Sequence, residues 1–161
     1  MVKNKHIDIL VIGSGPGGYA AAFRAADLGR KVMLVDKDPT LGGVCLNRGC
    51  IPSKTLLHIA KVLEETESLK KMGVTFSKPK IDIKSVRDWK NKVVSQLSNG
   101  IGQMAKARKV ETLQAEATFL SDTEVELKTD SKKETITFDH CIIAAGSSSS
   151  VIPGIPFKNE N

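Results

Sequence analysis

Aromatic residues are scarce in this chain of 161 residues, where Phe, Trp and Tyr together make up 4% of the sequence. Proteins that bind single-stranded nucleic acid stack bases on exposed aromatic rings, so this scarcity argues against that function. Long apolar runs are also lacking, and no stretch approaches the roughly 18 apolar residues that a membrane span needs. We therefore expect no nucleic-acid partner and no membrane segment.

An export signal is missing from the N-terminus. Lysines followed by an apolar run superficially resemble a signal peptide, but Gly-Ser-Gly-Pro at residues 13–16 breaks the run too early, and a buried strand explains it better. We therefore expect a cytoplasmic protein. The net charge of +6 is dispersed in short basic groups with acids nearby, which is typical of a solvated surface. An acidic partner protein or a phosphate-bearing cofactor would be attracted by the same charge.

Cysteine is rare as well: the chain has three, and Cys45 and Cys50 lie together in "GVCLNRGCIPSK" at residues 43–54. Without an export signal, the pair does not suggest an extracellular disulfide framework. A structural zinc site needs four ligands, and Cys141 falls in a predicted strand. The histidines are scattered along the chain, at His6, His58 and His140. We therefore expect no metal site.

Three interpretations of the cysteine pair remain: two inert thiols, a small structural disulfide, or a redox couple. A disulfide that closes so short a loop gains little stability through the unfolded state. Gly49 and Pro52 predict that Cys50 lies near a helix N-terminus, where the thiolate is favoured. A regular helix would hold the two Cα atoms more than about 8 Å apart, so a bonded pair requires a distorted first turn.

The first forty residues have the pattern of a strand, a helix and a second strand. Apolar runs at residues 7–12 and 32–35 have the length of strands. Residues 20–28 between them are good helix formers and are followed by Gly29, a typical C-terminal cap. This order within about thirty residues predicts the βαβ unit of a parallel sheet.

Two amphipathic helices and a change of period follow. Apolar residues recur at helical spacing over 56–63, with Gly73 as a stop, and again over 83–104, with Asp82 as a candidate N-cap. Over roughly 110–138 apolar and polar residues alternate between short polar turns, which predicts a small antiparallel β-meander.

The end of the chain predicts one more strand and then a linker. "CIIAAG" at 141–146 has the pattern of a buried strand, whereas "SSSS" at 147–150 reads as an exit from the domain. The sequence thus predicts an α/β fold, a Rossmann-like domain over residues 1–150 with a parallel sheet and a meander. Residues 151–161 are expected to be a linker.

A glycine motif lies between the first predicted strand and helix. Gly13, Gly15 and Gly18 have the spacing Gly-x-Gly-x-x-Gly, in which the first allows a tight turn, the second a close approach of pyrophosphate, and the third helix–strand packing. The helix N-terminus offers N–H groups to the phosphates. Asp36 ends the second strand, where a carboxylate accepts hydrogen bonds from ribose hydroxyls and repels a 2′-phosphate. We therefore expect a dinucleotide other than NADP.

These motifs together resemble the flavoprotein disulfide reductases, also called pyridine nucleotide-disulfide oxidoreductases. The resemblance covers residues 7–153 and rests on "GGVCLNRGCIPSK" after a complete dinucleotide motif. "TLLHIAKVLEE" and "IIAAGS" are similar to the bacterial members that oxidise dihydrolipoamide. A glutathione- or mercuric-reductase-like enzyme is an alternative, and so is a nucleotide-binding module without catalysis.

The resemblance implies FAD as the cofactor and a role for each matching residue. Cys45 would be the thiol that exchanges with the lipoyl sulfurs, Cys50 would face the flavin, and Lys54 would lie near the reactive edge of its ring. Arg48 departs from the family pattern, which has an apolar residue there, and its role stays open between tuning the thiolate and plain exposure. The implied FAD-binding positions are Gly13, Gly15, Gly18, Asp36, Lys37, Gly43, Val44, Cys45, Lys54, Ala117, Ala144 and Gly146.

The resemblance also implies parts that these 161 residues do not match. Family members are longer and have an NAD-binding domain, a dimerisation domain, and a His–Glu base supplied by the second subunit of a homodimer. The partners implied are lipoyl domains of 2-oxo-acid dehydrogenase complexes or of the glycine cleavage system. For these residues alone we expect weak or absent FAD binding and no lipoamide–NAD turnover.

Overall fold

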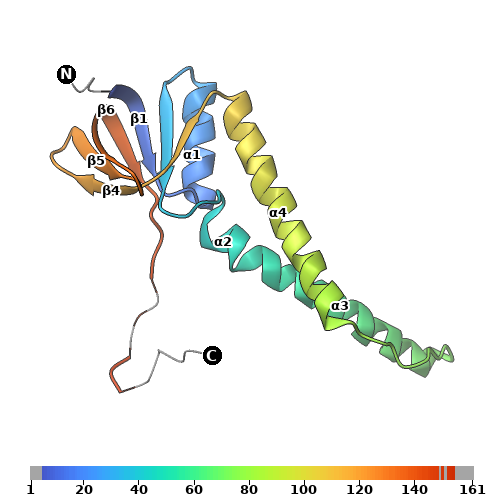
Figure 1. The fold of residues 1–161 in the computed structure, drawn as a ribbon. Helices are drawn as coiled ribbons and strands as arrows, with labels where there is room; N and C mark the ends of the chain where they lie inside the picture. The colour runs from blue at the N-terminus through green and yellow to red at the C-terminus, as the bar shows by residue number, and fades with distance from the viewer. Residues whose placement is uncertain (1–4, 149, 151, 155–161) are drawn as a thin grey trace.

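One mixed six-stranded sheet with helices on one side forms the fold (Figure 1). The structure, a computed structural model, describes residues 5–148, 150 and 152–154. The strands have the order β3-β2-β1-β6-β5-β4. This architecture confirms the predicted α/β, Rossmann-like class. In chain order the elements are β1 (Lys5–Ile12), α1 (Pro16–Asp27), β2 (Val32–Asp36), α2 (Gly43–Asn47), α3 (Cys50–Ser68), η1 (Leu69–Met72), α4 (Ile83–Ala107), β3 (Glu111–Gln114), β4 (Glu116–Phe119), β5 (Glu124–Lys128) and β6 (Lys133–Ile143).

The parallel half of the sheet comprises β3, β2, β1 and β6. Its central strands are apolar because both faces are covered, as expected of a parallel sheet. On the helical face, Val11 and Leu34 pack with Phe23 of α1 and Ile101 of α4 in one buried cluster. This packing holds the carboxyl ends of β1 and β2 beside the start of α1, where the glycine motif lies.

The antiparallel half comprises β4, β5 and β6 and covers the other face of the sheet. Leu127 and Phe138 from this half pack against Leu10, Met33 and Val35 from the parallel strands. The sheet therefore curls so that its two halves enclose a second core.

The predicted antiparallel meander is confirmed as β4, β5 and β6, but its bounds differ from the prediction at both ends. Its first segment is divided: β3 joins β2 in parallel, and only β4 joins the antiparallel half. The break falls at Ala115, which is 5% exposed and donates its N–H to the Asp36 carbonyl at 2.9 Å. At the other end, "CIIAAG" is not a separate strand, because β6 runs unbroken from Lys133 to Ile143. No Gly or Pro separates Phe138 from Cys141, so the strand continues.

Helix α1 begins at Pro16, four residues earlier than predicted. Proline suits the first turn of a helix, where its missing N–H costs no hydrogen bond. The helix ends as expected, because Gly29 adopts the left-handed conformation with φ +79°.

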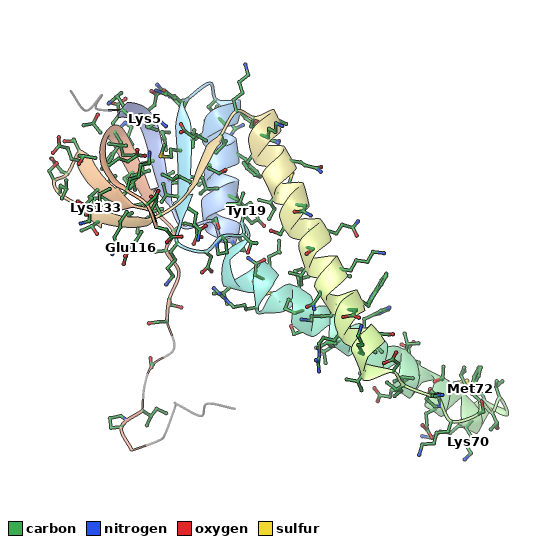
Figure 2. The ribbon with its side chains drawn as sticks, in the orientation of Figure 1. Lys5, Tyr19, Lys70, Met72, Glu116 and Lys133 are labelled. Carbon is green, nitrogen blue, oxygen red and sulfur yellow. The ribbon has the colours of Figure 1, made fainter. Side chains whose placement is uncertain are left out.

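Helices α3 and α4 form a long pair that extends away from the sheet, with Lys70 and Met72 near its tip (Figures 1 and 2). Asp82 caps α4 as predicted, accepting hydrogen bonds from the N–H groups of Lys84 at 2.9 Å and Ser85 at 3.3 Å. Among the residues that the structure describes, no helix is both long and apolar enough to cross a membrane.

Candidate active site

A cavity of about 800 Å³ opens at the carboxyl ends of the parallel strands. Open α/β sheets bind ligands at this edge. Its wall includes ten of the twelve predicted cofactor-binding residues: Gly13, Gly15, Asp36, Lys37, Gly43, Val44, Cys45, Ala117, Ala144 and Gly146. Gly18, Cys50 and Lys54 do not line it.

The three motif glycines differ in what surrounds them. A Cβ on Gly13 would lie 2.2 Å from the Ala144 carbonyl oxygen, and one on Gly18 would lie 1.7 Å from the Gly13 carbonyl oxygen. Neighbouring backbone atoms therefore leave no room for a side chain at Gly13 or Gly18. A Cβ on Gly15 would meet no atom within 4 Å, and Gly15 lines the cavity at the N-terminus of α1. The open side of Gly15 lets a ligand approach the backbone.

Asp36 is held at the cavity by three hydrogen bonds. Its Oδ2 accepts from both the backbone N–H and the hydroxyl of Ser14, each at 2.6 Å, and its Oδ1 accepts from the Asp38 N–H at 2.9 Å. Burial raises the pKa of Asp36, but these hydrogen bonds outweigh it, so the net pKa lies below its ordinary value. The carboxylate is thus ionised and fixed in place at neutral pH.

Ser14, which is fully buried, was not predicted as a site residue. It occupies a variable position of the glycine motif, so the motif itself says nothing about it. The signal in the sequence was a hydroxyl residue two positions after Ile12, the last residue of the first predicted strand, together with an acid at the end of the next strand.

The two cysteines lie on different helices. Cys45 is in α2, which ends at Asn47, and Cys50 is the first residue of α3. Between them, Arg48 (φ −135°, ψ −4°) and Gly49 (φ −126°, ψ −102°) have non-helical backbone conformations. No disulfide joins the two cysteines in this structure. The break supplies the distortion that the sequence required for a bonded pair, and it places Cys50 at a helix N-terminus as predicted.

The Cys50 side chain is the main cause of a raised pKa at the Cys45 thiol. Its hydrogen bond raises the pKa of the Cys45 thiol, and partial burial adds to the rise. The Cys50 backbone N–H and the charge of Lys54 act against that rise and lower the pKa. Lys54 therefore acts electrostatically on the cysteine pair, although it lies outside the cavity wall.

The chain matches, over residues 7–161, the family described as "Pyridine nucleotide-disulphide oxidoreductase". It belongs to this family. Three relatives are each named dihydrolipoyl dehydrogenase. That of Buchnera aphidicola (subsp. Acyrthosiphon pisum) is 51% identical over 97% of this chain, that of Haemophilus influenzae 49% over 99%, and that of Vibrio cholerae 46% over 99%. The matches cover 33%, 34% and 34% of those relatives, so the chain spans about a third of their length.

Within this pyridine nucleotide-disulphide oxidoreductase, Cys45 contributes to the cavity wall and Cys50, although beside it, does not. The sequence assigned Cys50 to the flavin and Cys45 to the substrate. The cavity wall alone does not decide between the two thiols, and the assignment stays a prediction.

Arg48 is partly exposed, and it is not among the side chains that shift the pKa of Cys45. Its guanidinium forms an ion pair with the Asp38 carboxylate, and both residues line the cavity. Arg48 is 58% exposed and Asp38 22% exposed. Asp38, an acid two residues after the end of β2, is a cavity residue that was not predicted from the sequence.

A group of possible metal ligands lies on the outer part of β1 and β6. His6, Asp8 and Asp139 each place one ligand atom within 4.8 Å of the others. His6 was therefore not as isolated as the sequence suggested. Its Nε2 lies 3.2 Å from Asp139 Oδ1, and both side chains are more than half exposed. No cysteine belongs to this group, so it lends no support to a zinc site at Cys45 and Cys50.

Proposed function

We propose that this chain is the part of a dihydrolipoyl dehydrogenase that binds FAD and carries the redox disulfide. The observation that carries the proposal is the placement of Cys45 and Cys50 across a helix break, with Cys45 in the wall of a dinucleotide-sized cavity. Ligand pockets of roughly 300–1,000 Å³ are usual for small molecules and cofactors. The identities of 46–51% with relatives of that name support the same enzyme.

The residues of the cavity fit FAD. The open face of Gly15 and the N–H groups at the start of α1 suit a pyrophosphate, and no acidic side chain lies in the first turn of that helix. Asp36, ionised and fixed by Ser14, suits the ribose hydroxyls. Ala117 and the segment 144–146 offer small side chains along the cavity wall, where flat rings can pack. When bound, FAD supplies a two-electron acceptor beside the disulfide.

The cysteine pair would perform a thiol–disulfide exchange. A thiolate of dihydrolipoamide attacks Sγ of Cys45 in the oxidised pair, the Cys45–Cys50 bond breaks, and Cys50 leaves as a thiolate. The second lipoyl thiolate then attacks the lipoyl sulfur that is bonded to Cys45. This closes the ring of lipoamide and releases the Cys45 thiolate. The pair has gained two electrons, and the two thiol protons have gone to bases. Lys54 stabilises the thiolate form by its charge.

The remaining steps would use residues outside this chain. We propose that NAD⁺ is the final acceptor and that its site, together with the base that accepts the thiol protons, lies in the two-thirds of the relatives that this chain does not match. Lipoyl domains of a 2-oxo-acid dehydrogenase complex or of the glycine cleavage system would be the protein partners, and the complete enzyme would be a homodimer. These 161 residues alone would bind FAD weakly or not at all and would not turn over.

The test is a reductive titration of the complete protein that the gene encodes, after reconstitution with FAD. Half-way through reduction we expect a long-wavelength charge-transfer band between a thiolate and the flavin. The band should vanish in Cys50→Ser and persist in the matched variant Cys141→Ser, whose thiol lies in β6. A flavin that titrates without any thiol-dependent band would contradict the proposal.

Substrate assays on the same protein separate the alternatives within the family. Rapid NAD⁺-linked oxidation of dihydrolipoamide, with slow or no reduction of glutathione disulfide or Hg²⁺, is the expected pattern. The reverse preference would assign the chain to another disulfide reductase.

A further inference from the structure

Arg48 joins two walls of the cavity. It follows the last residue of α2, on the wall that carries Cys45, and its ion-pair partner Asp38 follows β2 on the wall that carries Asp36. The Asp38 N–H also hydrogen-bonds the Asp36 carboxylate at 2.9 Å. Arg48 therefore acts at the Asp36 end of the cavity, although it stands between the two cysteines in the sequence.

The thiols do not account for Arg48. Cys50 and Lys54 are the side chains that shift the pKa of Cys45, and the guanidinium of Arg48 is turned to a carboxylate instead. An arginine paired in this way has little net charge to offer a thiolate. The effect of Arg48 is therefore on Asp38, the carboxylate with which it pairs.

Acidic side chains outnumber basic ones in the cavity wall. Three carboxylates, Asp36, Asp38 and Glu116, face two bases, Lys37 and Arg48. Glu116 is labelled in Figure 2, close to the point where the chain leaves the sheet after β6. The excess of one negative charge opposes a ligand whose pyrophosphate is itself anionic, and removal of Arg48 would double the excess.

We propose that Arg48 determines the affinity of the cavity for an anionic dinucleotide by neutralising Asp38. The inference rests on the proposed function, which assigns the cavity to FAD. Arg48 is a specificity-determining residue in this proposal: it makes a cavity with two neighbouring acids, Asp36 and Asp38, acceptable to a pyrophosphate.

A purely mechanical role is the competing explanation, since the ion pair also ties together the ends of segment 38–48. That segment has other ties. Asn47 Nδ2 donates to the carbonyl oxygens of Thr40 and Leu41, each at 3.3 Å, and the Ser98 hydroxyl donates to Leu41 O at 3.0 Å. Other contacts therefore duplicate the mechanical restraint, whereas Arg48 is the base that pairs with Asp38 among the described residues.

The experiment uses the complete protein, stripped of cofactor, in four forms: unsubstituted, Arg48→Val, Asp38→Asn, and the double variant. Binding of FAD, ADP and uncharged adenosine is measured by calorimetry at low and high salt. At low salt we expect Arg48→Val to weaken ADP and FAD binding about three- to tenfold and Asp38→Asn to strengthen it by about the same factor. The double variant should bind within about twofold of the unsubstituted protein, and high salt should shrink every difference.

Adenosine and a remote pair are the controls. Adenosine carries no phosphate, so its affinity should stay within about twofold in all four forms. Lys84→Ala and Asp88→Asn, which break an ion pair of 2.7 Å at the start of α4, should leave ADP binding unchanged.

Three results separate the possibilities. Opposite shifts in the two single variants support the proposal. Weakening in both, with adenosine weakened in parallel and no recovery in the double variant, overturns it in favour of a mechanical role. Failure of the unsubstituted protein to bind FAD or ADP overturns the proposed function, and the inference with it.

Discussion

Gly49 packs against the carbonyl group of Val44, so closely that a Cβ at position 49 would lie 3.1 Å from the Val44 oxygen and 3.5 Å from the Cα of Cys45. The two residues belong to opposite sides of the break between α2 and α3. Their contact lies between Cys45 and Cys50 in the chain, so we expect it to affect how near the two cysteines come to each other. The lack of a side chain at position 49 is therefore part of the geometry of the two cysteines.

We expect Gly49→Ala to impair the cysteine pair more than the fold. The added methyl group must displace the Val44 carbonyl by a few tenths of an ångström, which moves α2 against α3. The rate of Cys45–Cys50 disulfide formation in a glutathione buffer should fall several-fold, while the melting temperature changes little. Gly100→Ala is the matched control, because its Cβ meets open space in the middle of α4, and it should stabilise the protein by about 0.5–1 kcal/mol. Equal disulfide rates in the two variants would show that the contact does not position the thiols.

The glycine motif should separate into structural and binding positions. Gly18→Ala places a methyl group 1.7 Å from the Gly13 carbonyl oxygen, so we expect a loss on the order of 3 kcal/mol or more, seen in chemical denaturation. Gly15→Ala meets no protein atom and should keep the stability while lowering FAD affinity in the complete protein. A Gly15→Ala variant with unchanged FAD affinity would show that the pyrophosphate lies elsewhere.

Ser14 and Asp36 should give a measurable dependence of stability on pH. Because the hydrogen bonds hold the pKa of Asp36 below its ordinary value, the folded state gains stability from the ionised carboxylate. That gain is complete above the ordinary value of about 4 and is lost as the pH falls through the lower folded value. Ser14→Ala removes the hydroxyl donor, so the variant should lose less stability than the unsubstituted protein when the pH falls from 6 to 3. Thermal unfolding curves for the two proteins across this range check the prediction, and parallel curves would contradict it.

Cys45 should alkylate at a lower pH once Cys50 is removed. The Cys50 side chain is the main cause of the raised pKa of the Cys45 thiol, so Cys50→Ala is expected to lower that pKa. Lys54→Met should shift it upwards, because the charge of Lys54 favours the thiolate. Iodoacetamide rates at Cys45, followed by mass spectrometry from pH 6 to pH 10 in the reduced 161-residue chain, measure both shifts. An unchanged pH profile in both variants would contradict the prediction.

Local sequence signals predicted the parallel core but not the course of the chain between its layers. The apolar runs, Gly29 and the cap residue Asp82 each act within a few residues, and each was read correctly. The change of layer at Ala115 is different in kind, since an alternating pattern looks the same in a parallel and an antiparallel strand. Which strands β3 and β4 pair with determines the change of layer, and β2, the partner of β3, is distant in the sequence.

The site shows the same limit. The glycine spacing and Asp36 predicted where a dinucleotide would lie, because the motif carries its own geometry. Ser14 and Asp38 were not predicted as site residues, because their roles come from contacts with residues distant in the sequence. Arg48 was noticed only as a departure from a pattern, and its partner across the cavity could not be read from the sequence.

The pairing of β1 with β6 also has a consequence during synthesis. Lys5 of the first strand pairs with Ile136 of the last, and seven such partners join the two strands. During synthesis on the ribosome, the edge of β1 that pairs with β6 therefore stays unpaired until nearly the whole domain has left the exit tunnel. For that interval its apolar residues, Leu10 and Val11 among them, are open to chaperones or to the strands of a neighbouring chain.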